Sequence, residues 1–288
     1  MTVLRGATAV DGGFVRVLGD RDVPRALELL GRDPVANVFV TSRIDAVGLD
    51  PSRLGAQVWG YGREGGLDAL CYAGANLIPV GGDPTALEAF ARHGVRQGRR
   101  CSSIVGPAGA VAALWEVLGP AWGPPREARW RQPLMVTTAN PQVAPDPEVR
   151  RVRPDELELL MPASIAMFTE EVGVSPTVGD GGAAYRARVR ELVASGRAFA
   201  RFDRNRVVFK AEVGAVTPSA CQVQGVWVDP ELRGRGLSVA GMAAVVTACL
   251  RDVAPAVSLY VNDFNEPARR SYERVGFGEI GTFASILF

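Results

Sequence analysis

The chain has few of the residues that build the commonest hydrolytic and metal sites. His93 is the only histidine among 288 residues, which disfavours a Ser–His–Asp triad and a histidine-based metal site. The four cysteines lie far apart in the sequence, and no pair of them has the spacing of metal ligands. They are Cys71, Cys101, Cys221 and Cys249. We therefore expect reduced thiols and no bound metal.

Long apolar runs and an excess of one charge are missing as well. No stretch approaches the roughly 18 uninterrupted apolar residues of a membrane-spanning helix, and the N-terminus lacks the pattern of a signal peptide. The 32 basic and 31 acidic residues leave a net charge of +1, and no basic stripe indicates nucleic acid or a membrane. These absences predict a cytoplasmic globular protein that binds neither nucleic acid nor membranes.

Lysine is nearly absent, because Lys210 is the only one and every other basic residue of the Lys+Arg set is arginine. Arginine side chains suit the recognition of phosphates and carboxylates. A GC-rich genome produces the same bias through its codons and is the commoner cause of such a composition.

A proline-rich segment divides the chain into two nearly equal parts. Thr138–Pro147 holds three prolines and no apolar periodicity, which is typical of a linker. With the linker placed at 139–147, the sequence predicts an N-terminal α+β domain at 1–138 and a second domain at 148–288.

The two parts begin with similar patterns. In the first part, the pattern predicts a strand at Phe14–Leu18 and a helix at Val23–Leu30. In the second part, it predicts a strand at Val149–Arg153 and a helix at Glu156–Ala166. So short a match also arises by chance, but it predicts two copies of one α+β architecture.

The C-terminal part contains a strand, a glycine-rich turn, a helix and a second strand. The pattern predicts strands at Cys221–Val228 and Val257–Val261, with the long apolar helix Leu237–Val253 between them. Such a crossover makes the two strands parallel. Ahead of it, Ala198–Phe202 and Val207–Val213 have the pattern of a hairpin.

The turn that follows the first of these strands is basic and rich in glycine. Arg233-Gly234-Arg235-Gly236 leads into the helix, whose first amides have no internal partners and carry partial positive charge. Glycines let an anion approach those amides closely. The segment predicts a pyrophosphate cradle; the alternative is a basic turn with no ligand. It is neither a Walker loop nor a dinucleotide fingerprint, because the required Gly-Lys-Ser/Thr and third glycine are missing.

A second motif follows around the predicted helix Pro267–Val275. Asn265 is a natural N-cap and Gly276 a natural C-terminal cap. Tyr272 lies about two turns beyond Asn265 and shares a face with it. A tyrosine at this position can donate a proton to a thiolate leaving group.

These two motifs together resemble the double signature of the GNAT acetyltransferase superfamily, an R-x-x-G-x-G turn after a strand and then N-x-x-A-x-x-x-Y-x-x-x-G-F. The resemblance covers roughly Val149–Phe288 and is strongest over Gln224–Phe277. It implies an α+β fold in which a central mixed sheet, flanked by helices, splays open to hold acyl-CoA. The N-terminal half lacks both motifs, so it would be a degenerate, catalytically silent second GNAT-like domain.

Carried onto this sequence, the resemblance implies roles for individual residues. The backbone of Val226, Trp227 and Val228 would pair with the pantetheine arm, Asn265 would bind the CoA arm, and Tyr272 would protonate the departing thiolate. The pyrophosphate would lie against Arg233, Gly234, Arg235, Gly236, Leu237, Ser238 and Val239. Ser238 departs from the Gly or Ala that is usual in the family, but serine is small and its hydroxyl could donate to phosphate.

The general base is not fixed by the resemblance. The family often uses a glutamate on the central strand, where this chain has Gln222 and Gln224. Glu212, on the preceding strand, is the nearest candidate. Glu170 and Glu171 are alternatives, and each of the three could instead be a solvated surface charge.

The sequence thus predicts an N-acyltransferase that uses acetyl-CoA or another acyl-CoA and no metal. An amine of a small molecule, peptide or protein would attack the thioester directly. The alternative is a non-catalytic acyl-CoA-binding regulatory module, which the missing strand carboxylate favours and Tyr272 disfavours. The N-terminal half is expected to shape the acceptor site or an oligomer, with a homodimer as the candidate assembly.

Overall fold

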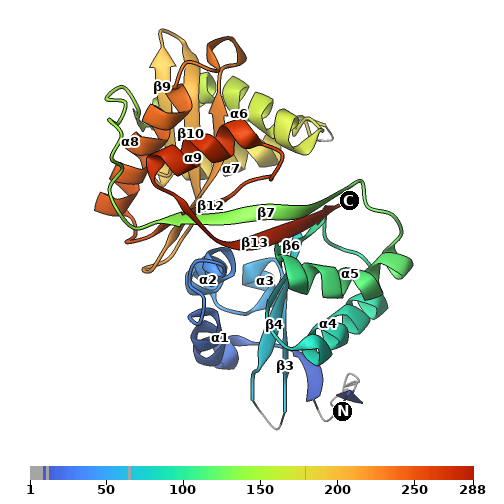
Figure 1. The fold of residues 1–288 in the computed structure, drawn as a ribbon. Coiled ribbons are helices and arrows are strands. Elements are labelled where there is room, and N and C mark those ends of the chain that lie inside the picture. The colour runs from blue at the N-terminus through green and yellow to red at the C-terminus, as the bar shows by residue number, and fades with distance from the viewer. Residues whose placement is uncertain (1–8, 11–12, 64–65, 179) are drawn as a thin grey trace. The chain divides into compact units, whose positions relative to one another are not determined.

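A computed structural model describes residues 9–10, 13–63, 66–178 and 180–288. The chain forms two compact units (Figure 1). The first comprises the described residues up to Leu134 together with Ile280–Phe288, and the second comprises Met135–Glu279. In the described parts of the chain, no helix is both long and apolar enough to cross a membrane.

The first unit is a mixed sheet with helices on both faces. Its strand order is β1-β2-β3-β4-β5-β6-β13, with β5 and β6 parallel and the other neighbours antiparallel. The strands are β1 Ala9–Val10, β2 Gly13–Val17, β3 Gln57–Gly62, β4 Ala69–Ala73, β5 Asn76–Gly81, β6 Ser103–Pro107 and β13 Gly278–Leu287. The helices are α1 Val23–Leu30, α2 Val38–Val47, α3 Pro51–Leu54, α4 Pro84–Gln97 and α5 Ala108–Trp122.

Alternation along the strands explains why this sheet is covered twice. Val58 and Leu70 pack in one apolar cluster with α1 and α2, whereas their neighbours Trp59 and Cys71 pack in another with α4 and α5. Successive strand residues point to opposite faces, so a strand that is apolar throughout needs helices on both sides.

The second unit has the same construction. Its order is β7-β12-β11-β10-β9-β8, with β11 and β12 parallel and the strands from β8 to β11 antiparallel. The strands are β7 Glu127–Thr137, β8 Arg150–Arg151, β9 Ala198–Asp203, β10 Arg206–Val216, β11 Cys221–Val228 and β12 Val257–Tyr260. The helices are α6 Leu157–Val172, α7 Ala183–Ala194, α8 Leu237–Asp252 and α9 Glu266–Val275. The predicted parallel crossover and the predicted fold class are confirmed.

The two units therefore repeat one chain path. Each begins with a strand followed by helices, continues through three antiparallel strands, and then forms a helix, a parallel strand and another helix. The N-terminal half is thus a second copy of the α+β architecture that the similar beginnings of the two halves predict.

The copies also share a local contact at their starts. Arg16 on β2 donates to both carboxylate oxygens of Asp22, at 2.8 and 2.7 Å. Arg150 on β8 donates in the same way to Glu156, at 2.7 Å for both bonds. The arginine precedes the carboxylate by six residues in both cases, and these bonds lower the pKa of Asp22 and that of Glu156 to about 2.

This contact predicts acid sensitivity. A carboxyl whose pKa is lower in the folded than in the unfolded chain stabilises the fold above pH ~4, and this stabilisation is lost as the pH falls towards about 2. Glu156→Gln removes the charge and with it this pH dependence. Between pH 7 and pH 2.5, we therefore expect the unfolding free energy of the wild type to fall by on the order of 1–2 kcal/mol more than that of the variant. Urea titrations at the two pH values measure this difference, and equal losses in both proteins would contradict the prediction.

The ends of the two copies differ from what the sequence suggests. The last strand, β13, belongs to the first unit from Ile280 onward and pairs with β6 (Figure 1). β7 begins in the first unit, but its end, from Met135, lies in the second, where β12 is its neighbour. The compact units therefore cut the chain differently from the predicted ranges of 1–138 and 148–288.

Candidate functional site

The predicted phosphate cradle lies at the start of α8. Gly236 is the N-cap residue, and Gly234 and Gly236 have φ values of +76° and +82°. Side chains other than glycine rarely adopt this left-handed conformation. A Cβ added at either glycine would meet no heavy atom within 4 Å. The backbone path therefore favours glycine at both positions, and the space in front of them is open.

Consecutive amides are available at this turn. The N–H groups of Val239 and Ala240 donate to the carbonyl of Gly236, at 3.1 and 3.3 Å. In the described part of the chain, the N–H groups of 234–238 have no acceptor. Successive free amides at a helix start form a concave site of positive potential that suits a phosphate group.

Next to this turn, the sheet opens between β11 and β12. The two strands pair only at Cys221 with Val257 and at Gln222 with Ser258, although β11 runs on to Val228. On its other side, the end of β11 stays paired with β10. Val226–Val228 therefore lies beyond the last pair with β12, where the sequence predicts contact with an extended ligand.

Tyr272 lies on α9 and is 7% exposed. Its hydroxyl makes no hydrogen bond to the residues that the structure describes, and its ring packs edge-on against Phe277. Burial raises the pKa of Tyr272 above its usual range, and the negative charge of Glu171 raises it further. The phenol therefore keeps its proton at neutral pH, as a proton donor must. At the start of α9, Asn265 uses its Oδ1 to cap the helix at Ala268.

Glu170, one of the alternative base candidates, links α6 to the cradle. Its Oε1 accepts a hydrogen bond from the indole N–H of Trp227 at 3.2 Å, and its Oε2 pairs with Arg233 at 2.7 Å. Arg233 also donates from Nε to the carbonyl of Val228 at 3.1 Å. The Arg233 guanidinium, predicted to face phosphate, is thus engaged with protein groups and braces the loop.

Glu212, the first candidate for the base, is buried with 4% exposure. Its Oε1 accepts a hydrogen bond from Lys210 Nζ at 2.6 Å. Tyr185 on α7 is close enough that the Glu212 charge contributes to raising its pKa, after the larger effect of burial. Neither Lys210 nor Tyr185 is among the site residues that the sequence predicts. The available signal for Lys210 is that it is the single lysine and lies within an apolar strand.

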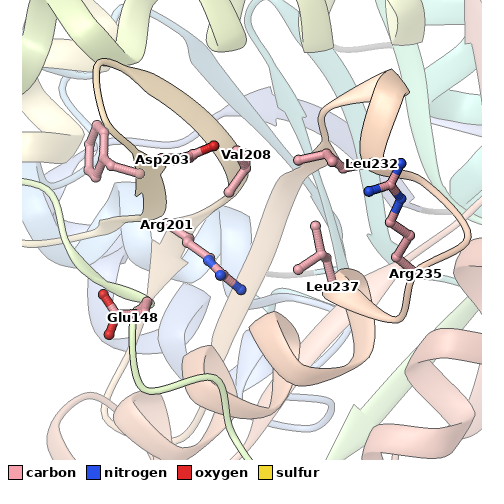
Figure 2. Close-up of a pocket in the computed structure, with 8 residues that line it drawn as sticks. Glu148, Arg201, Asp203, Val208, Leu232, Arg235 and Leu237 are labelled. Atoms are coloured by element: carbon pink, nitrogen blue, oxygen red, sulfur yellow. The ribbon is translucent and has the colours of Figure 1, made fainter.

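A cavity of about 460 Å³ adjoins the cradle on the side of β9 and β10. It is lined by Glu148, Arg201, Phe202, Asp203, Val208, Leu232, Arg235 and Leu237 (Figure 2). Only Arg235 and Leu237 belong to the predicted cofactor-binding set. The cavity reaches the cradle but includes neither Tyr272 nor Asn265, so the candidate site follows the open edge of β11 instead.

Comparisons with known proteins agree with this description. Residues 182–277 match the acetyltransferase (GNAT) family, and residues 56–160 match a family described as a domain of unknown function (DUF4081). Comparison with curated protein sequences finds no match. The match lies within the C-terminal unit, covers both of its motifs, and is to the family that those motifs predict.

Solved structures share the fold over nearly the whole chain. A GCN5-related N-acetyltransferase from Sphaerobacter thermophilus has a TM-score of 0.64 at 17% identity over 97% of both chains. A Drosophila protein has a TM-score of 0.65 at 15% identity, with 95% of this chain and 98% of that chain covered. A tandem GNAT protein from the clavulanic acid biosynthesis pathway has a TM-score of 0.56 at 14% identity, covering 96% and 98%. The chain as a whole thus has a tandem GNAT-like fold.

Proposed function

We propose that the C-terminal unit transfers an acyl group from acyl-CoA, with acetyl-CoA as the expected donor, to an amine. Acyl transfer in general follows from the family. The observation that carries the finer proposal is the row of free amides at 234–238 beside the open edge of β11. The amides would hold the pyrophosphate, and Val226–Val228 would pair with the pantetheine arm. The thioester at the end of that arm would then lie beside Tyr272.

The proposed reaction is a direct attack. The amine nitrogen forms a bond to the thioester carbon, the bond from that carbon to sulfur breaks, and the amine loses a proton. Tyr272 gives its proton to the departing thiolate and regains one from solvent. Holding both reactants in line provides much of the rate enhancement, and proton transfer by a positioned side chain provides a further ~10²–10⁴-fold.

The group that accepts the proton of the amine stays a prediction. Glu212 is the sequence candidate, but it is buried and its Oε1 accepts a hydrogen bond from Lys210 Nζ at 2.6 Å. Glu170 is held by Trp227 and Arg233. This shortage of an accessible strand carboxylate favours the second candidate function, a regulatory module that binds acyl-CoA without turnover.

Ligand binding can be tested on the purified full chain. Saturating CoA should raise the melting temperature by several degrees, because a ligand at ~100 times its Kd stabilises the folded state by ~2.7 kcal/mol. Differential scanning fluorimetry measures the shift, and titration calorimetry gives the Kd. Dephospho-CoA and AMP are the controls, since AMP lacks both the pyrophosphate and the pantetheine. No shift and no heat with CoA or acetyl-CoA would remove the basis of the proposal.

A further inference from the structure

Lys210 occupies an unusual place for the only lysine of the chain. It lies on β10 and is 0% exposed, although charged side chains are almost never fully buried without a partner. Its Nζ donates to Glu212 Oε1 at 2.6 Å and to the carbonyl of Gly225 at 3.1 Å. One ammonium thus joins a carboxylate on its own strand to the backbone of β11.

The Gly225 carbonyl lies at an irregularity in the pairing of β10 with β11. Lys210 pairs with Trp227, and Glu212 pairs with Gln224. Between these pairs β10 has one residue, whereas β11 has two, Gly225 and Val226. This is a β-bulge, and Gly225 has the left-handed φ of +59° that such a bulge requires.

The bulge and the ion pair are packed directly against each other. A Cβ added at Gly225 would lie 3.3 Å from Lys210 Nζ, 3.2 Å from Glu212 Oε2 and 3.0 Å from Met167 Cε on α6. A bulge takes backbone groups out of the ladder, and a buried carbonyl without a partner is costly. Lys210 Nζ donates a hydrogen bond to this carbonyl, and Glu212 accepts a second one from the same ammonium.

We propose that Lys210 and Glu212 are positioning residues that hold the bulge at Gly225, and that the bulge sets the direction of the β11 edge on which acyl-CoA binds. The choice of acyl-CoA as the ligand rests on the proposed function. The clamp, by which we mean the Lys210–Glu212 pair that holds the bulge, does not rest on it. Val226 follows Gly225 directly, and Val226–Val228 lies past the last pair with β12, which is at Gln222. A relaxed bulge would therefore turn the amides and carbonyls of Val226–Val228 away from the ligand.

This assignment gives Glu212 a different task from that of a base. With Oε1 bonded to Lys210 and Oε2 against Gly225, its carboxylate faces the bulge. Arginine is not expected to replace Lys210, because its planar guanidinium is larger than an ammonium group and holds its donors in one plane. The chain, which uses arginine elsewhere, keeps its one lysine where a compact ammonium fits.

The experiment compares a double variant with a matched pair elsewhere in the unit. Lys210→Met/Glu212→Leu removes both charges, and replacing a buried ion pair by apolar side chains of similar volume often preserves stability. Lys210→Met alone would leave an unpaired buried carboxylate, so it serves only as a stability reference. Arg150→Met/Glu156→Leu removes an ion pair of the same unit that lies away from the bulge.

Two measurements test the effect of the ion pair on the bulge and its effect on CoA binding separately. In the ligand-free double variant, we expect the amides of Val226–Val228 to exchange hydrogen at least about tenfold faster, while those of α8 are unchanged. We also expect the Kd for CoA to rise at least about tenfold with the melting temperature maintained, and the Arg150/Glu156 control to keep the wild-type Kd.

Any other result overturns one part of the proposal. Unchanged hydrogen exchange in the folded double variant would show that Lys210 does not hold the bulge. Faster exchange with an unchanged Kd would separate the bulge from binding, and an unchanged Kd with lost turnover would make Glu212 a catalytic residue instead. If the wild type binds no CoA, the proposed function fails, and hydrogen exchange still decides the clamp.

Discussion

Replacing Tyr272 by phenylalanine should lower turnover by ~10²–10⁴-fold and leave CoA affinity nearly unchanged. The hydroxyl is needed when the thiolate departs and not when CoA docks. The ring packs in the apolar cluster of α8 and α9, and the hydroxyl has no protein partner in the described part of the chain, so phenylalanine should fit without loss of stability. Steady-state kinetics together with calorimetric Kd values measure the two effects separately.

The pH profile provides a second check on Tyr272. The active form is the protonated phenol, and burial raises its pKa above the ordinary value of ~10. The contribution of Tyr272 should therefore persist to at least pH ~10 and decline only above that, and this basic limb should disappear in the phenylalanine variant.

Tyr185→Phe is the matched control for this substitution. The Tyr185 hydroxyl donates to the carbonyl of Ser164 at 2.8 Å, so its loss should lower the melting temperature and leave the shape of the pH profile unchanged. If Tyr272→Phe retains most of the wild-type rate with the true acceptor, Tyr272 only packs against the sheet and another group or water protonates the thiolate.

Gly236→Asp should weaken CoA binding by ~10²–10³-fold. The added carboxylate would stand at the mouth of the amide row, where repulsion of the pyrophosphate at ~4 Å is worth up to ~4 kcal/mol at an effective dielectric constant of about 20. The space in front of Gly236 is open, so the folded state should persist.

Gly236→Asn is the matched control, because asparagine has the same shape without the charge. Both residues tolerate the left-handed backbone better than other side chains do. The difference between the two variants therefore reports electrostatic repulsion, and it should shrink as salt is added. Equal wild-type affinity in both variants would move the phosphate site away from this turn.

The parts of the fold that the sequence predicts well are those with local signals. The bounds of α1 and β11 agree with the expected ranges, and α8 ends within one residue of its prediction. An uninterrupted apolar period flanked by a glycine turn or a proline leaves few alternatives. The helix α2 has no such signal, because its Asn37 N-cap makes no side-chain cap and its apolar residues do not form one stripe.

The arrangement within the candidate site depends on pairs that are distant in sequence. Arg233 meets Glu170, 63 residues away, and Lys210 meets the carbonyl of Gly225, 15 residues away. The second contact lies at the β-bulge, where β11 has one residue more than β10. An extra residue of this kind leaves no periodic trace in the sequence.

The place of β13 has a consequence for biosynthesis. Ala284 and Ile286 on this strand belong to the core beneath α4 and α5, and the strand covers the edge of β6. The 145 residues of Met135–Glu279 must be translated before this strand exists, which takes roughly 7–30 s at about 5–20 residues per second. During that interval the nascent N-terminal copy has an open sheet edge and an incomplete core, exposed to chaperones and to other nascent chains. A premature stop codon just after Glu279 would therefore damage the first copy to be made rather than the last.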